Sequence, residues 1–337
     1  MQKYDVFFYE AFEEEQAALR ACLPAVINAG YTWKTTQEYG LPRPAAPCIS
    51  IRTQSTLPES WAGHLQAILS RSTGYDHLLR FRDRATPPPA CGHLPLYCHR
   101  AVAEQALMMW MALLRRLPRQ LRQFRTFDRD GLTGREARDR TLLVVGVGNI
   151  GHEVVMIGKG LGMHTLGVDI RRKHPDVDYA DISQAIGQAD VIVCAMNLTD
   201  DNRGYFDGAR LKAAKPGAIF INIARGELSP PATLLELLQI GQLGGVGLDV
   251  YNEESALAVA LRAKHPADTP DVRAVLELAN LDNVILTPHN AFNTLEAVAR
   301  KAEQSVQQIT AWLETGAFRW PLPETIDGVK ANETLPQ

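Results

Sequence analysis

Three glycines at a fixed spacing are the clearest chemical signal in the sequence. Gly146, Gly148 and Gly151 form a G-x-G-x-x-G motif. The run TLLVVGVG (141–148) predicts a buried strand that ends in the motif, and a helical pattern follows it. Asp169 ends the next predicted strand, 18 residues after Gly151. This context predicts a dinucleotide site, because such a turn lets backbone N–H groups at a helix N-terminus approach a pyrophosphate.

The acidic residue also predicts which dinucleotide binds. The Asp169 carboxylate can accept both ribose hydroxyls of the adenosine half and would repel a 2′-phosphate, so NAD is favoured over NADP. The basic run 171–173 follows directly. It could bind such a phosphate, or it could be a solvated charged run. Asn149 and Ile150, which lie inside the glycine motif, are assigned to the cofactor site with it.

Alternating strand and helix patterns surround the motif and predict parallel, doubly wound α/β sheets. Because the motif begins near residue 146, a folded unit precedes it. We therefore expect a cofactor domain inserted into a second domain, with a cleft between the two. Strands are expected at 4–9, 48–51, 68–70, 94–97, 141–148, 163–170, 189–196, 218–224, 245–251 and 283–289. Helices are expected at 11–23, 59–68, 100–124, 233–243 and 301–316, the last ending at Gly316.

Composition excludes several classes of protein. The net charge is −3, from 35 basic and 38 acidic residues, so no basic surplus is present to bind nucleic acid. No apolar run reaches the ~18 residues of a membrane-spanning helix. The five cysteines form no C-x-x-C pair, and the nine histidines show no familiar metal spacing. With no signal-peptide pattern at the N-terminus, we expect a cytoplasmic protein with reduced thiols and no metal.

Several separated motifs together resemble the D-isomer-specific 2-hydroxyacid dehydrogenase family. They are GVGNIG (146–151), KPGAIFINIARGEL (215–228), GVGLDVYNEE (245–254) and TPHNAFNT (287–294), with support from STGYDHL (72–78) and YCHRAVAEQAL (97–107). The chain is most similar to the D-lactate dehydrogenase branch. The resemblance implies a Rossmann NAD-binding domain (98–296) inserted into a flavodoxin-like substrate domain (1–97 and 297–337), and a homodimer.

The resemblance places a catalytic trio on Arg225, Glu254 and His289. Reduction of a 2-keto acid needs a hydride at the carbonyl carbon and a proton at its oxygen. His289 suits the proton because imidazole titrates near neutral pH. Glu254 would orient the ring and favour its protonated form, although Glu253 competes for this role. Arg225 would grip the substrate carboxylate with its planar fork of donors.

Other positions follow from the same resemblance. Asn197, Ala224 and Asp249 are assigned to the cofactor, with Asp249 facing the nicotinamide carboxamide. The backbone N–H groups of Thr73 and Gly74 would bind the substrate carboxylate. Two aromatic residues would line the substrate pocket or simply pack in a core: Tyr97 and Phe292.

Four residues depart from the usual family pattern: Asn197, Gln105, Ser255 and Asn293. None of these departures removes a catalytic group. We expect reversible NADH-dependent reduction of a small 2-keto acid to the D-2-hydroxy acid, with pyruvate and D-lactate as the leading pair. The alternatives are a bulkier 2-keto acid, hydroxypyruvate or phosphite, and, from another class, an NAD-sensing corepressor of the C-terminal-binding-protein type.

Overall fold

The chain forms two compact units in the computed structural model, which describes residues 4–263 and 269–323. Within that range, unit 1 comprises 4–98 and 293–323, and unit 2 comprises 99–263 and 269–292. The sequence places the second boundary at 296/297, whereas the units divide at 292/293. The difference has a simple cause: α12 (Leu295–Thr315) begins before 297, and its cap Thr294 accepts from the Ala297 N–H.

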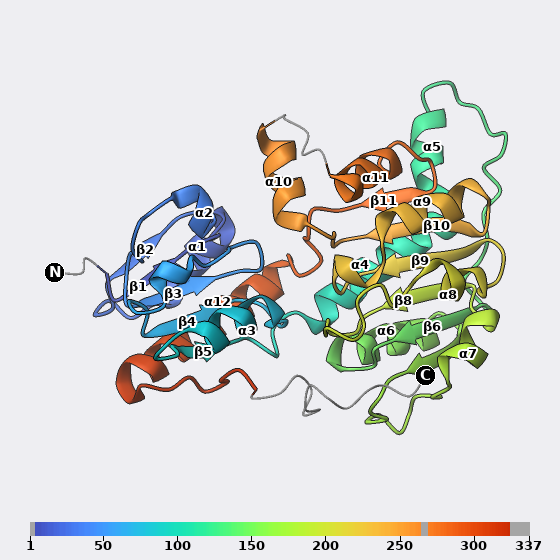
Figure 1. The fold of residues 1–337 in the computed structure, drawn as a ribbon. Helices are drawn as coiled ribbons and strands as arrows, with labels where there is room; N and C mark the ends of the chain where they lie inside the picture. The colour runs from blue at the N-terminus through green and yellow to red at the C-terminus, as the bar shows by residue number, and fades with distance from the viewer. Residues whose placement is uncertain (1–3, 264–268, 324–337) are drawn as a thin grey trace. The chain divides into compact units, whose positions relative to one another are not determined.

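Unit 1 is built on a five-stranded parallel sheet with the order β2-β1-β3-β4-β5 (Figure 1). This is the flavodoxin-like order, in which the chain winds outward from a central strand in both directions. Apolar strands with full burial, such as CISI, require helices on both faces. The strands are β1 (Val6–Phe8), β2 (Ala29–Tyr31), β3 (Cys48–Ile51), β4 (Ala67–Ser70) and β5 (Ala90–Gly92).

The helices of unit 1 come from both ends of the chain. α1 (Glu13–Cys22) packs against α12, so the last long helix completes the first domain. As predicted, α12 ends at Gly316, whose φ of +76° is the left-handed conformation that glycine adopts without strain. The shorter helices are α2 (Thr36–Tyr39), α3 (Asp76–Arg84) and the 3₁₀ turn η1 (Glu59–Trp61).

Unit 2 contains a six-stranded parallel sheet with the order β11-β10-β9-β8-β6-β7 (Figure 1). The order reverses beside β6, which creates the switch point where Rossmann folds bind dinucleotides. An isolated parallel bridge from Gly167 to Tyr179 extends the sheet beyond β7. The strands are β6 (Thr141–Val145), β7 (His164–Val168), β8 (Val191–Cys194), β9 (Ala218–Asn222), β10 (Leu243–Leu248) and β11 (Val284–Leu286).

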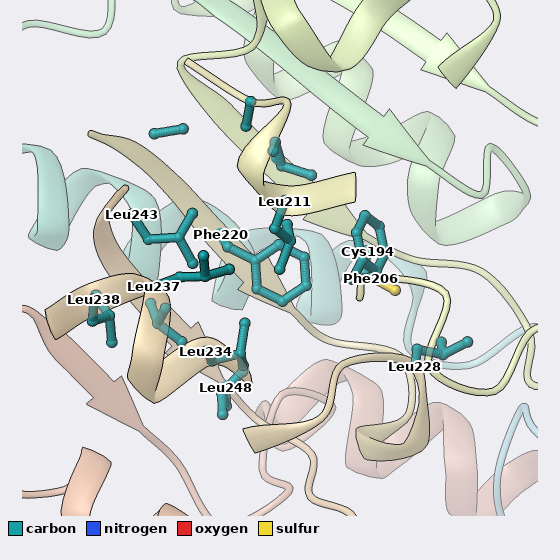
Figure 2. Close-up of a cluster of buried hydrophobic side chains, with 14 of the residues drawn as sticks. Cys194, Phe206, Leu211, Phe220, Leu228, Leu234, Leu237, Leu238, Leu243 and Leu248 are labelled. Atoms are coloured by element: carbon teal, nitrogen blue, oxygen red, sulfur yellow. The ribbon is translucent and has the colours of Figure 1, made fainter. Parts of the chain in front are cut away.

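Helices cover both faces of this sheet. α4 (His99–Leu114) contacts α6 (Asn149–Gly160), β9 and β10 on one face. On the other face, leucines of α9 (Pro231–Gln239) pack on Phe220 and Phe206, whose rings lie 4.8 Å apart (Figure 2). The remaining helices are α5 (Leu117–Gln123), α7 (Ile182–Ala185), α8 (Gly208–Lys212), α10 (Glu254–Ala263), α11 (Pro270–Leu278) and the 3₁₀ turns η2 (Ile186–Gln188) and η3 (Gly226–Leu228).

Three predicted elements were wrong in detail. The helix expected over 100–124 is two helices, because Arg116 adopts a φ of +54° and Pro118 enters the first turn of α5. The helix expected over 59–68 is one 3₁₀ turn, and the edge strand is Ala90–Gly92 rather than 94–97. β2 and α3 were not predicted; β2 is only three residues long, Ala29–Tyr31.

Candidate active site

The predicted functional residues of unit 2 follow one row of paired strand ends. Pairing in register joins Val168 to Val145, Val145 to Cys194, and Cys194 to Asn222; the row then continues through Leu248 to Leu286. Because all six strands are parallel, the segments that leave this row emerge at one edge of the sheet. Those segments carry Asp169, Gly146, Asn197, Ala224, Arg225, Asp249 and His289.

The glycine turn has the tight geometry that a pyrophosphate site needs. Gly146 has a φ of +91°, and a Cβ there would lie 2.4 Å from the Met196 backbone. A Cβ on Gly151 would lie 1.9 Å from the Gly146 carbonyl oxygen. At Gly148, by contrast, a Cβ would meet no atom within 4 Å. Gly148 precedes Asn149, the first residue of α6, so open space adjoins the N–H groups of that helix and fits a dinucleotide phosphate.

Asp169 is oriented by the same turn. Its carboxylate accepts hydrogen bonds from the Val147 N–H at 2.6 Å and the Arg171 N–H at 2.8 Å. A carboxylate has further lone pairs, so these bonds leave acceptor capacity for ribose hydroxyls. The acidic group is thus fixed one strand away from the glycine turn, where the adenosine ribose of a bound NAD would lie.

His289 and Glu254 form a close pair. The ring nitrogen Nδ1 lies 2.8 Å and 2.9 Å from the two Glu254 carboxylate oxygens. Glu254 is the first residue of α10, and both side chains are 18% exposed. Glu253 faces elsewhere, since its carboxylate accepts from the Thr269 hydroxyl at 2.5 Å. Of the two candidate acids, only Glu254 contacts the imidazole.

The backbone around His289 is anchored by Asp249. This carboxylate is 1% exposed and accepts from the Asn290 and Ala291 N–H groups and the Thr287 hydroxyl. Burial raises the pKa of Asp249, and these donors act against that rise. His289 itself has a φ of +51°, an unusual conformation that these bonds help to hold. The contacts of Asp249 therefore go to the histidine loop, and its role beside the nicotinamide stays a prediction.

Sequence reasoning assigned no supporting role to three residues around Asp249: Thr287, Gln105 and Tyr251. Thr287 donates to Asp249 at 2.5 Å and in turn accepts from the Gln105 side chain at 3.2 Å. The resemblance marks Gln105 only as a departure from the family pattern. The phenol of Tyr251 also donates to the Thr287 carbonyl, at 2.8 Å. No local signal marked Gln105, because α4 also carries the polar residues His99, Arg100 and Glu104.

Arg225 leaves β9 on a rigid turn. Buried Asn222 donates to the Arg225 carbonyl at 2.8 Å, and the guanidinium donates to the Ala224 carbonyl at 2.8 Å. The next residue must be glycine, because a Cβ on Gly226 would lie 1.8 Å from the Tyr251 backbone. That contact packs the arginine turn against the segment that leads to Glu254.

The remaining predicted residues occupy well-defined places. In unit 1, Thr73 and Gly74 follow β4, and the Thr73 hydroxyl lies 3.4 Å from the Cys98 sulfur. Tyr97 is 4% exposed. In unit 2, Phe292 is 5% exposed, and the Asn197 carbonyl accepts from Asn202 at 2.8 Å. The burial of Tyr97 and Phe292 is compatible both with a place in the substrate pocket and with packing in a core.

One histidine cluster lies beside the cofactor edge. His152 Nε2 lies 3.0 Å from the Asp176 carboxylate, and the His152 and His174 rings stack at 4.0 Å with an angle of 11°. The possible ligand atoms of His152, His174 and Asp176 all lie within 4.8 Å of one another. Imidazole lone pairs lie in the ring plane, so parallel rings do not converge on one ion. We assign no metal to this cluster.

A parallel sheet with a glycine turn at its switch point, and with arginine, carboxylate and histidine at the same edge, defines an NAD-dependent dehydrogenase. Residues 107–291 match the NAD binding domain of the D-isomer specific 2-hydroxyacid dehydrogenases. The chain belongs to this family. None of the described helices is long and apolar enough to cross a membrane.

Individual relatives agree with this assignment. A D-lactate dehydrogenase of Curvularia clavata is 30% identical over 77% of this chain and 74% of its own length. An NAD⁺-dependent D-2-hydroxyacid dehydrogenase of Lacticaseibacillus paracasei is 32% identical over 66% of this chain and 68% of its own. The structure of Aquifex aeolicus D-lactate dehydrogenase with NAD and lactic acid superposes with a TM-score of 0.81, at 28% identity over 93% of this chain and 98% of that one. The chain is thus similar to the D-lactate dehydrogenase branch.

Proposed function

We propose that the chain catalyses the reversible NADH-dependent reduction of a small 2-keto acid to the D-2-hydroxy acid, with pyruvate and D-lactate as the reference pair. The observation that carries the proposal is the contact between Glu254 and His289 Nδ1. With Nδ1 held by the carboxylate, Nε2 is the ring nitrogen left for proton transfer.

The proposed chemistry divides between cofactor and protein. When bound, NADH supplies the hydride that forms the new C–H bond at the carbonyl carbon. Protonated His289 then gives its proton to the carbonyl oxygen, and Glu254 stabilises the imidazolium before that transfer. Arg225 holds the substrate carboxylate and polarises the carbonyl. Gly146, Gly148 and Gly151 would hold the pyrophosphate, and Asp169 the adenosine ribose. Thr73 and Gly74 are proposed to contribute N–H donors to the substrate carboxylate.

Oxidation of NADH, followed at 340 nm with a panel of 2-keto acids, tests the proposal. Chiral analysis of the product should show the D form. If the protein binds NADH but reduces none of the 2-keto acids in the panel, the enzymatic role is contradicted. Formation of the L-isomer would contradict the proposed stereochemistry.

We also propose a cytoplasmic homodimer formed through unit 2. The five cysteines are all unpaired, which fits a reducing compartment. Along α5 and the turn after it, Leu121, Phe124 and Phe127 are 66%, 73% and 71% exposed. Such a run of exposed apolar side chains is typical of an interface. Sedimentation of a Leu121→Asp, Phe124→Asp variant should show a monomer where the unmodified protein sediments as a dimer.

A further inference from the structure

The turn that follows β4 is held through its carbonyl groups. β4 and β5 are neighbouring parallel strands, so the chain leaves them side by side at one edge of the sheet (Figure 1). The Ser72 carbonyl accepts from the Leu94 N–H at 3.1 Å. The Thr73 carbonyl lies 3.1 Å from His93 Nδ1, and because a carbonyl oxygen can only accept, Nδ1 carries a hydrogen and donates it. Two successive carbonyls of the turn therefore face the segment that follows β5.

Holding these carbonyls also fixes where the next two N–H groups point. In a trans peptide the C=O and N–H bonds point in opposite directions, and the peptides of this turn are trans. The Thr73 N–H shares a peptide with the Ser72 carbonyl, and the Gly74 N–H shares one with the Thr73 carbonyl. Both N–H groups therefore point away from the segment after β5. In the part of the chain that the structure describes, neither N–H donates to a protein acceptor, so both are available to a carboxylate.

His93 is itself fixed on several sides. Its ring packs edge-on against the Tyr75 ring at 4.9 Å, and the residue is 9% exposed. Its N–H donates to the Trp320 carbonyl at 3.1 Å, and its carbonyl accepts from the Gln308 side chain at 2.9 Å. Burial lowers the pKa of His93, and the hydrogen bond to Thr73 acts against that fall. The ring is therefore neutral near pH 7, and its one hydrogen is on Nδ1.

A hydrogen-bond chain with a single direction holds the third carbonyl of the turn. The Ser72 hydroxyl donates to the Gly74 carbonyl at 2.6 Å. A hydroxyl has one hydrogen, so in the 2.6 Å contact between the Ser70 and Ser72 hydroxyls it is Ser70 that donates. Ser70 must then accept from His77 Nε2, which lies 3.0 Å away. All three carbonyls of the turn are thus held by the protein.

We propose that His93 is a positioning residue for substrate binding: by holding the Thr73 carbonyl, it aims the Gly74 N–H at the substrate carboxylate. The inference rests on the proposed function, in which Thr73 and Gly74 donate to that carboxylate. Without the His93 donor, the peptide between Thr73 and Gly74 can rotate, and substrate binding must order it again. The carboxylate is bound alike before and during hydride transfer, so the effect falls on KM more than on kcat.

Removal of the donor tests this role. His93→Leu replaces the ring by an apolar side chain that cannot donate. We expect KM for the best 2-keto acid to rise by about tenfold or more, while kcat changes by less than about threefold. The inhibition constant of oxamate, an unreactive analogue with the same carboxylate, should rise by the same factor. The Kd for NADH should not change, because the proposed cofactor residues lie in unit 2.

Two amide substitutions separate the hydrogen bond from the loss of the ring. His93→Asn places an amide N–H close to the position of Nδ1 and should recover most of the lost affinity. His93→Gln places it nearer the position of Nε2 and should resemble His93→Leu. Both keep a polar side chain, so this pair provides the test if His93→Leu does not fold, as circular dichroism will show. The matched control is His64→Leu, at an exposed histidine of the same unit, which should keep the KM.

The outcomes distinguish this inference from the proposed function. An unchanged KM in the variants that lack the donor, in protein that reduces 2-keto acids, would overturn the role of His93 and leave the proposed function intact. Equal increases in KM for His93→Asn and His93→Gln would also overturn it, because the ring's packing and not its hydrogen bond would then matter. If the unmodified protein reduces no 2-keto acid, the proposed function fails, and this inference fails with it.

Discussion

Both carboxylate oxygens of Glu254 lie against a single nitrogen of His289, at 2.8 Å and 2.9 Å from Nδ1. The acid therefore accepts the Nδ1 proton and fixes the ring's tautomer and direction. The backbone of the same residue is held from the other side, where Asp249 accepts the N–H groups of Asn290 and Ala291. The imidazole is positioned through both its side chain and its main chain.

This pair makes the first prediction. Glu254→Gln keeps the size and a hydrogen-bonding group but removes the charge that favours the protonated ring. The reductive kcat/KM should therefore fall by about tenfold or more, because no carboxylate then supports the ring that gives up the proton. Glu253→Gln is the matched control, because that carboxylate contacts Thr269 instead. Kinetics of Glu254→Gln that coincide with those of the control would mean that Glu254 does not assist His289.

Arg225 makes the second prediction. Arg225→Lys keeps the positive charge but loses the planar fork, so a carboxylate can no longer be held by two parallel bonds. We expect kcat/KM for the best 2-keto acid to fall by about tenfold or more, with losses in both kcat and KM. Arg203→Lys, a partly exposed arginine on a nearby turn of the same unit, should have little effect. Unchanged kinetics in Arg225→Lys would show that a different cation holds the substrate.

The ends of the parallel strands show how much of the site could be predicted from the sequence. The buried strands before Gly146, Asp169, Arg225, Asp249 and His289 were identifiable from apolar runs alone, and parallel topology then forces their ends to one edge. The choice of Glu254 over Glu253, by contrast, came only from the spacing of the resemblance, five residues after Asp249, and not from the residue types, which are the same at both positions. In the structure the backbone makes the distinction, since Glu253 adopts a φ of +53° and turns its side chain away from the ring.

Sequence patterns also failed to predict three other features of the fold and site. Gln105 and Thr287 lie far apart in the chain, so their hydrogen bond leaves no local signal. The break between α4 and α5 occurs at Arg116, whose left-handed φ is not a preference of arginine. Helical spacing over 59–68 also concealed the start of β4, because a short apolar run suits a strand or a helix equally well.

The glycine turn gives the third prediction, which separates folding from cofactor binding. A Cβ on Gly148 meets no protein atom within 4 Å, so Gly148→Ala should fold normally. The added methyl group would occupy space that we assign to the pyrophosphate, and we expect NADH affinity to fall by about tenfold or more. Gly160→Ala at the other end of α6 also meets no atom and should keep the affinity. Fluorescence titration measures both, and equal affinity in the two variants would place the pyrophosphate elsewhere.

Cofactor choice is the fourth prediction. The Asp169 carboxylate is fixed by the Val147 and Arg171 N–H groups, so it cannot easily turn away from a 2′-phosphate. We expect kcat/KM with NADH to exceed that with NADPH by about tenfold or more. In Asp169→Ser, the repulsion is removed while the basic run 171–173 remains, so the preference should shrink or reverse. Equal use of both cofactors by the unmodified enzyme would show that the basic run dominates.

The buried cluster of Glu15, Arg71 and Lys301 supports the fifth prediction, which concerns the stability of unit 1. Burial alone would raise the pKa of Glu15, but Arg71 and Lys301 together hold it at about 2. The folded-state pKa lies below the unfolded value, so the contribution is fully present above pH ~4.3 and is lost as the pH falls toward 2.

Substitutions at this cluster should have unequal costs, because two cations depend on one acid. Glu15→Gln leaves Arg71 and Lys301 buried without a counter-charge and should cost about 3–5 kcal/mol of unfolding free energy. Lys301→Met leaves the Arg71–Glu15 pair intact, with its 2.9 Å contact, and should cost clearly less. Glu14→Gln, at the adjacent exposed position of α1, is the control and should stay within about 0.5 kcal/mol. Urea unfolding at neutral pH and at pH ~3 measures all three; a Lys301→Met cost equal to that of Glu15→Gln would refute the shared-acid arrangement.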